Sequence, residues 1–305
     1  MPPQLIIDTD AGIDDAQALL LALGQPGVEV AAITTLSGNV HVDKVAKNVL
    51  KTLDAARQRV PVYRGVDRPL INDVNYAEDI HGTDGLGDCN LPEPSGQIEP
   101  EHAVLALCRM AAAHPGRYTL VAIGPLTNVA LATRLDPAFP RNLAGFTFMG
   151  GAYEARGNTS SVAEFNVYND PEAAAIVLNS FPRATMISWE LTLNHLVPWD
   201  KLAALDSKRG PAVEFFNKIS AFIEANLRRD GYQGMAMPDA LAVATAIAPG
   251  IVTQSVRAHV QVELSGTLTR GQTVVDWRGR PQVDIIKHID LERFWQMMVK
   301  SLRAE

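Results

Sequence analysis

The sequence predicts an α/β protein with an open, mostly parallel sheet flanked by helices, followed by a helical cap and C-terminal strands. Over the first two hundred residues, short apolar runs alternate with helical patterns, which is typical of β-α-β units. Gly and Pro residues separate these patterns, as Gly24, Pro26 and Gly27 do after the first one. Because ligands of parallel sheets bind beyond the carboxyl ends of the strands, we expect a functional site at that edge.

The first part of the chain contains the strands and helices of this sheet. We expect strands at residues 5–7, 28–36, 60–64, 118–123, 146–149 and 185–188. We expect helices at residues 14–23, 41–57 and 101–113, after Gly124-Pro125 as far as residue 135, and at 172–179. Asp170 followed by Pro171 is typical of a helix N-cap with Pro at the first helical position, so Asp170 receives no catalytic role.

The second part of the chain is organised differently. Helical patterns from 199 to 248, with a break at 231–238, predict the cap. Strands are then expected at 256–264, 273–277 and 283–287, with a turn at 278–281 and a closing helix at 291–302. Since no linker or repeat divides the sequence, we expect a single domain over residues 1–305. The long irregular segment 66–98 is typical of a functional lid.

Composition narrows the class of partner. The formal charge is −7, from 27 basic and 34 acidic residues, and no basic run stands out, so we expect no nucleic acid polymer as partner. The chain has neither an apolar run of membrane-spanning length nor a signal-peptide pattern, so we expect no membrane association and a cytoplasmic location. Cys89 and Cys108 show no zinc spacing, and we expect no disulfide between them.

The strongest chemical feature is a cluster of four aspartates at a predicted strand-to-helix junction: Asp8, Asp10, Asp14 and Asp15. Capping of the following helix explains one or two of them, because a helix N-terminus favours negative charge. Four carboxylates repel one another and require compensation. A hard cation supplies it, and oxygen ligands favour calcium or magnesium over zinc.

This cluster lies within residues 8–16, DTDAGIDDA, a segment that resembles the signature of the inosine-uridine-preferring nucleoside hydrolases. Further segments resemble that family in the same order: 37–39 (SGN), 81–82 (HG), 124–128 (GPLTN), 149–151 (MGG), 164–166 (EFN), 170–173 (DPEA) and 238–242 (PDALA). The resemblance runs from residue 8 to about 245 and implies a Rossmann-like nucleoside hydrolase fold. It also implies calcium-dependent hydrolysis of ribonucleosides to free base and ribose.

The resemblance implies a role for each matching residue. The calcium ligands would be the carboxylates of Asp10, Asp15 and Asp239 and the backbone carbonyl of Thr127. Asp10 would also take a proton from the calcium-bound water that attacks C1′. Asp14 and Asn166 would hold the ribose diol, Asn158 and Glu164 would reach the 5′-hydroxyl, and Asn39 would orient the reacting groups. Homo-oligomers are common in this family, so a homodimer or homotetramer is expected.

One position departs from the family pattern. Many members have His immediately before the aspartate that corresponds to Asp239, and that His is associated with protonating the leaving base. This chain has Pro238 there, and proline has no side-chain proton to give. Tyr232, Arg228 and His81 are candidates to replace it. The resemblance therefore does not predict which nucleobase this chain prefers.

Other interpretations of the sequence stay open at this stage. A haloacid-dehalogenase-type phosphohydrolase also begins with a strand that ends in Asp-x-Asp, but it needs a helix-borne Lys and a later acidic pair. A non-catalytic ribose- or nucleoside-binding protein of the same fold is the second alternative, and Pro238 favours it. Asn39 would also suit a turn, Glu164 and Asn166 a surface loop, and His81 an exposed loop position.

Overall fold

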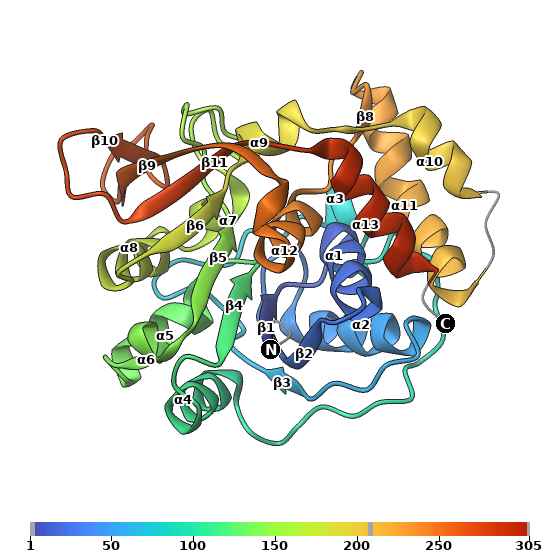
Figure 1. Cartoon of the computed structure of the whole chain (residues 1–305), viewed down its shortest axis with the longest axis horizontal. Coiled ribbons are helices and arrows are strands. Elements are labelled where there is room, and N and C mark those ends of the chain that lie inside the picture. The colour runs from blue at the N-terminus through green and yellow to red at the C-terminus, as the bar shows by residue number, and fades with distance from the viewer. Residues whose placement is uncertain (1–3, 207–209, 304–305) are drawn as a thin grey trace.

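A computed structural model describes residues 4–206 and 210–303 of the chain (Figure 1). The main sheet consists of β1 (Gln4–Thr9), β2 (Glu29–Thr35), β3 (Val62–Arg64), β4 (Tyr118–Ala122), β5 (Gly145–Met149), β6 (Ala184–Ile187), β9 (Val252–Val262), β10 (Thr273–Asp276) and β11 (Val283–Ile289). Their order is β10-β9-β11-β6-β5-β4-β1-β2-β3. From β3 to β11 all neighbours are parallel, whereas β9 is antiparallel to both β11 and β10. The predicted fold class is confirmed.

Helices cover both faces of this sheet. They are α1 (Ile13–Gly24), α2 (Val42–Ala55), α3 (Glu78–His81), α4 (Ala103–Ala113), α5 (Thr127–Leu135), α6 (Phe139–Asn142), α7 (Phe165–Asn169), α8 (Pro171–Ser180), α9 (Trp189–Asn194), α10 (Trp199–Asp206), α11 (Pro211–Arg229), α12 (Pro238–Ile247) and α13 (Leu291–Leu302). Side chains alternate along β1, so Leu5 and Ile7 pack in one apolar cluster and Ile6 packs in the other.

The two clusters occupy opposite faces of the sheet. Helices α1, α2, α11, α12 and α13 form the cluster on one face, and α4, α5, α6 and α8 form the cluster on the other (Figure 1). Alternating burial of this kind requires helices on both faces of a parallel sheet. Of the helices expected to form the cap over residues 199–248, α10 and α11 do so, joined to the body through a short antiparallel pair of β7 (Val197–Pro198) with β8 (Gly234–Met235). Helix α12 instead packs on α1 in the body.

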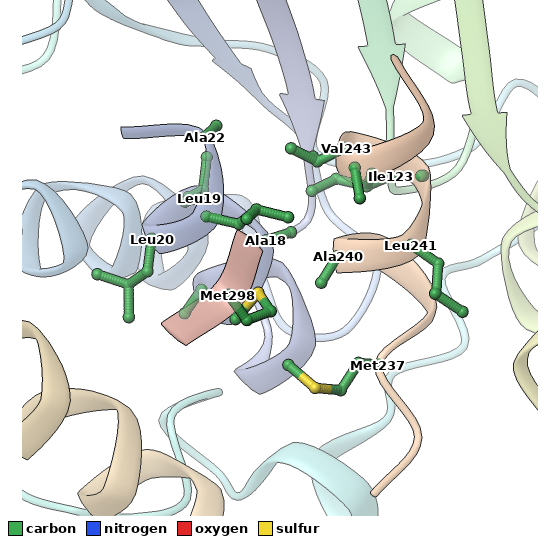
Figure 2. Close-up of a cluster of buried hydrophobic side chains, with 14 of the residues drawn as sticks. Ala18, Leu19, Leu20, Ala22, Ile123, Met237, Ala240, Leu241, Val243 and Met298 are labelled. Carbon is green, nitrogen blue, oxygen red and sulfur yellow. The ribbon is translucent and has the colours of Figure 1, made fainter. Parts of the chain in front are cut away.

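Helices α1, α12 and α13 pack together beside the ends of β1 and β4. Figure 2 shows Ala18 and Leu19 of α1 beside Ala240 of α12 and Met298 of α13. The approach of α13 to the end of α1 is close, because a Cβ at Gly24 would lie 2.1 Å from the carbonyl oxygen of Ser301. This packing brings the first turn of α12 to the first turn of α1, which decides where their acidic residues lie.

Some element boundaries differ from the sequence expectations. The strand expected at 256–264 begins earlier, at Val252, and the irregular segment 66–98 contains the short helix α3. Asp170 caps α8 as expected, accepting a hydrogen bond from the amide of Ala173, with Pro171 at the first position. In the part of the chain that the structure describes, no helix combines the length and apolar character needed to span a membrane.

Candidate active site

A cavity of about 330 Å³ lies where the strand order reverses between β1 and β4. Its wall includes Asn39 after β2, Ile123 after β4, Met149 at the end of β5 and Trp189 after β6. All of these positions follow the carboxyl ends of parallel strands, as expected for a ligand site in such a sheet. Most of the expected site residues line this cavity: Asp14, Asn39, His81, Asn158, Glu164, Asn166, Tyr232 and Asp239.

Three carboxylates converge at the cavity from two helix N-termini. Asp14 and Asp15 lie in the first turn of α1, and Asp239 lies in the first turn of α12. One oxygen of each lies within 4.8 Å of an oxygen of the other two. The free amides and dipoles at helix N-termini partly compensate this negative charge. Oxygen ligands at this spacing could hold a divalent metal ion.

Asp10 directly follows β1 and is fully buried, near the carboxylates of Asp14 and Asp15. Its Oδ2 accepts a hydrogen bond from the backbone amide of Asn39 over 2.8 Å. Its Oδ1 is buried without a hydrogen-bond partner among the described residues. Glycines make room for this carboxylate, because a Cβ would lie 2.1 Å from Oδ2 at Gly38 and 2.7 Å from Oδ1 at Gly124.

Asp15 is held in place by three donors. Its Oδ1 accepts from the hydroxyl of Thr9 at 2.5 Å. Its Oδ2 accepts from the amide of Gly12 at 2.9 Å and from Nδ2 of Asn39 at 3.0 Å. Asn39 therefore contacts both Asp10 and Asp15, which goes beyond the role of a turn residue.

Burial and mutual repulsion shift the protonation of this group. Burial, together with the carboxylate of Asp15, raises the pKa of Asp10 well above its ordinary value. Burial, together with the carboxylates of Asp14, Asp15 and Asp10, does the same for Asp239. Burial raises the pKa of Asp14 to about 6 and, with repulsion from Asp14, that of Asp15 to about 6. Shifts of this kind are typical of functional sites and disappear when a cation compensates the charge.

His81 reaches the cavity from α3 and is buried rather than exposed. Its Nδ1 accepts a hydrogen bond from the amide of Ile13 at 3.1 Å and lies 3.7 Å from Oδ1 of Asp14. Burial lowers the pKa of His81 to about 4. The ring is therefore neutral near pH 7 and carries its proton on Nε2, so it donates a hydrogen bond more readily than a proton.

Glu164 and Asn166 belong to the start of α7 rather than to an ordinary surface loop. Glu164 is the N-cap, and its oxygens accept from the amides of Asn166, Val167 and Gly151. Burial raises the pKa of Glu164 to about 7. Nδ2 of Asn166 donates to the carbonyl oxygens of Ile123 and Met149, each at 3.2 Å.

Asn158 precedes this helix and joins it through its side chain. Its Oδ1 accepts from the amide of Phe165 at 2.8 Å. That contact leaves Nδ2 without a hydrogen-bond partner in residues 4–206 and 210–303. Asn158, Glu164 and Asn166 are thus brought to the same cavity with donor or acceptor groups still available to a ligand.

Three expected ligands do not line the cavity wall. Asp10 and Asp15 lie directly against the lining residue Asn39, whereas Thr127 lies elsewhere. It lines a separate surface hollow beside Arg64 and His102, and its hydroxyl donates to Asp170 at 2.7 Å. It is the first residue of α5, so its carbonyl points along the helix axis. The residue of this strand-to-helix turn that lines the cavity is Ile123. Sequence reasoning did not single out Ile123, because an apolar residue at a strand end gives no chemical signal.

The structure places the three candidates for leaving-group activation differently with respect to the cavity. Tyr232 and His81 line the cavity. Arg228 does not; its guanidinium lies 4.1 Å over the ring of Trp199 and pairs with Glu224. Pro238 lines the cavity as the first residue of α12, where proline suits a helix start.

Asn128 is a further residue whose role the sequence did not reveal. Its Nδ2 donates to Oδ1 of Asp8 at 2.9 Å and to the carbonyl of Thr35 at 3.0 Å. Asp8, the fourth aspartate of the cluster, is fully buried and does not line the cavity. Burial raises the pKa of Asp8 to about 7. Asp8 and Asn128 thus tie β1, β2 and α5 together beneath the site.

Comparison with known proteins agrees with this geometry. The model of the family described as inosine-uridine preferring nucleoside hydrolase matches residues 5–296. The chain belongs to this family. It is therefore a hydrolase that acts on N-glycosyl compounds, and hydrolysis of ribonucleosides is the activity of its class.

Individual members of the nucleoside hydrolase family match over nearly their whole length. The chain is 37% identical to the inosine-uridine preferring nucleoside hydrolase of Crithidia fasciculata, over 99% of this chain and 98% of that protein. It is 33% identical to the pyrimidine-specific ribonucleoside hydrolase RihB of Escherichia coli strain SE11, over 99% and 97%. The structure of an inosine-guanosine nucleoside hydrolase superposes with a TM-score of 0.93 at 35% identity, covering 100% of both chains.

Proposed function

We propose that this nucleoside hydrolase is calcium-dependent and that Asp10 activates the attacking water. The observation that carries the proposal is the unpartnered Oδ1 of Asp10 near the converging carboxylates of Asp14, Asp15 and Asp239. All these groups offer oxygen atoms, and calcium prefers six to eight oxygen ligands. The donor set therefore fits calcium.

The residues proposed to hold calcium are Asp10, Asp15 and Asp239, with one backbone carbonyl. We place that carbonyl at Ile123 rather than Thr127, since Ile123 lines the cavity and Thr127 does not. Bound calcium would lower the pKa of water and orient the 2′- and 3′-hydroxyls of the ribose.

We assign water activation, binding of the ribose diol and stabilisation of positive charge to residues of the chain itself. The amide of Asn39 fixes Oδ2 of Asp10, which leaves Oδ1 to accept the proton of the water that attacks C1′. Asp14 would accept a hydrogen bond from the ribose diol. The amide of Asn166 is anchored through Nδ2, so its Oδ1 would accept the second hydroxyl. The buried carboxylates would stabilise positive charge on the ribose as the glycosidic bond breaks.

The 5′-hydroxyl and the base would be bound by other parts of the cavity. Asn158 would donate from Nδ2 to the 5′-oxygen, and Glu164 would contact the same hydroxyl. With Pro238 unable to donate, Tyr232 and His81 would stabilise the departing base, His81 by a hydrogen bond from Nε2. Base preference stays open, because the relatives carry names that differ in the base. A cytoplasmic location and a homodimer or homotetramer remain predictions.

The assignment of Asp10 is tested by substitution. Asp10→Ala removes both a proposed ligand and the proposed base, so turnover of a ribonucleoside should fall by about 10⁴-fold or more. Asp8→Asn is the matched control, because Asp8 is a buried carboxylate two residues earlier whose Oδ1 accepts hydrogen bonds from Thr34 and Asn128. Near-normal ribose release by Asp10→Ala would show that another group is the general base. Intact nucleoside binding without ribose release by the wild-type protein would favour the non-catalytic binding protein.

A further inference from the structure

Glu190 is a buried carboxylate that the proposed reaction does not use. It lies in the first turn of α9, next to Trp189 of the cavity wall, and only 1% of its surface is exposed. No Lys, Arg or His pairs with it among the described residues. A buried carboxylate requires hydrogen-bond donors, so its partners indicate what it does.

The partners of Glu190 are three backbone amides of one loop. Oε2 accepts from the amide of Tyr153 at 3.1 Å, and Oε1 accepts from the amides of Glu154 at 2.9 Å and Arg156 at 3.4 Å. Ala155, in the middle, has a φ of 58°, which is in the left-handed region. Successive amides that converge around a left-handed residue form a concave anion site. Here the anion is the side chain of Glu190.

This loop carries the groups proposed to bind the 5′-hydroxyl. We call residues 151–164 the 5′ loop, because it contains Asn158 and ends at Glu164. Its second half is closed by the carbonyl of Ala163, which accepts from the amide of Asn158 at 3.2 Å. Its first residue, Gly151, donates to Glu164 at 2.8 Å. Glu190 holds residues 153–156 through three amides, next to Ala152, which exchanges two hydrogen bonds with Thr273.

We propose that Glu190 is a positioning residue for recognition of the 5′-hydroxyl. By fixing residues 153–156, it sets the position of Asn158, which follows two residues later. This inference rests on the proposed function, since it assumes that Asn158 and Glu164 contact the 5′-hydroxyl of a nucleoside. It goes beyond that function by assigning 5′-hydroxyl selectivity to a residue that does not contact the substrate.

The substitution Glu190→Gln tests this inference at nearly constant volume. Glutamine has one acceptor oxygen instead of two, and its NH₂ group would face the amide donors, so at least one amide loses its partner. Glu154→Gln is the matched control, because Glu154 is an exposed carboxylate of the same loop. Glu190→Asp keeps the charge but shortens the side chain, and serves as a second variant if the glutamine protein folds poorly.

The measurement compares kcat/KM for a ribonucleoside and for its 5′-deoxy analogue. The wild-type enzyme should prefer the 5′-hydroxyl by about 10- to 100-fold, as expected when a missing hydroxyl leaves polar groups unpaired. In Glu190→Gln the preference should shrink at least about fivefold, with the 5′-deoxy analogue hydrolysed at nearly the wild-type rate. Hydrogen exchange should accelerate at the amides of residues 153–156. Glu154→Gln should change neither quantity.

The alternative outcomes are distinct. Equal losses on both substrates would show that Glu190 supports the fold in general, and an unchanged preference would show that Glu190 does not position Asn158; either result overturns the inference. A wild-type enzyme that hydrolyses ribonucleosides without any 5′-hydroxyl preference would instead overturn the roles given to Asn158 and Glu164, and the inference with them. A wild-type protein that hydrolyses no ribonucleoside would overturn the proposed function itself.

Discussion

The carboxylate of Asp10 lies directly against Gly124, where an added Cβ would come 2.7 Å from Oδ1 and 3.0 Å from the backbone nitrogen of Asp10. Contacts this short cannot persist, so Gly124→Ala should displace the carboxylate. Because a misplacement of ~1 Å can cost about 10²-fold in rate, kcat should fall by that order. Gly250→Ala is the control, since a Cβ at Gly250 meets no atom within 4 Å. Wild-type kcat in Gly124→Ala would mean that the position of Oδ1 is not critical.

Recognition of the ribose diol predicts selectivity for the sugar. Asp14 and Asn166 line the cavity and are the residues we propose to bind the 2′- and 3′-hydroxyls, so a 2′-deoxyribonucleoside would leave one of these groups unpaired. Ribonucleosides should exceed 2′-deoxyribonucleosides by about 10³-fold or more in kcat/KM. Competition between a ribonucleoside and its deoxy analogue in one reaction measures the ratio directly. Comparable rates would show that the diol is not bound by buried groups.

Pro238 lines the cavity but has no side-chain proton to give a leaving base. A p-nitrophenyl riboside needs little protonation of its leaving group, so the enzyme should hydrolyse it well. If Tyr232 is the acid, Tyr232→Phe should slow natural nucleosides by about 10²-fold while sparing the activated riboside. His81→Ala should have a smaller selective effect, because a neutral ring donates only a hydrogen bond.

Equal losses on the two substrate types would assign Tyr232 and His81 to positioning rather than to leaving-group activation. No change in either variant would leave solvent or another cavity group as the donor. Arg228 is a poor alternative, since its guanidinium is engaged by Trp199 and Glu224.

The buried Asp8 predicts how stability depends on pH. Its pKa of about 7 in the folded chain exceeds the ordinary value of 3.8, so the folded state binds the extra proton between these values. This contribution to stability is fully present below pH 3.8 and is lost as the pH rises through about 7. Asp8→Asn cannot ionise, so its gain in urea midpoint over wild type should grow as the pH rises from about 4 to about 7 and level off above, in calcium-free buffer.

His81 has the opposite effect on the pH dependence of the folding stability. Burial lowers the pKa of His81 from 6.5 to about 4, so its contribution is present above pH 6.5 and is lost as the pH falls through about 4. Comparing Asp8→Asn with wild type at each pH leaves this effect out, because both proteins retain His81. A difference in urea midpoint that is independent of pH would show that Asp8 is already ionised in the folded protein.

The strand-and-helix alternation was sufficient to predict the sheet, because parallel strands buried on both faces are nearly continuous apolar runs. The burial of Leu5, Ile6 and Ile7 in β1 follows from that pattern. The position where β9 begins did not follow from it. Residues 252–256 lie at the sheet's antiparallel end, where the strand is only partly buried and the apolar signal is weak.

The sequence predicts those parts of the site whose functional side chains are close together along the chain. Asp10, Asp14 and Asp15 follow one strand, so their proximity could be inferred locally. Asp239 joins them only through the packing of α12 on α1, which no local pattern encodes. The same holds for Ile123, which we propose to contribute its carbonyl, and for Glu190, whose side chain reaches the amides of residues 153–156 only in the folded chain.

We expect hydrolysis to require calcium bound by the aspartate cluster. Each of Asp10, Asp15 and Asp239 is buried, with little to compensate its charge except helix N-termini and polar neighbours. Binding should therefore be tight enough to require a chelator for removal, and it should raise the urea midpoint.

The most direct test is ribose release from a panel of ribonucleosides by metal-free enzyme, before and after calcium is restored. We expect removal of the metal to abolish release, calcium to restore it, and Asp239→Ala to require far more calcium for any recovery. Full activity in enzyme verified to be free of metal would rule out a calcium-dependent reaction.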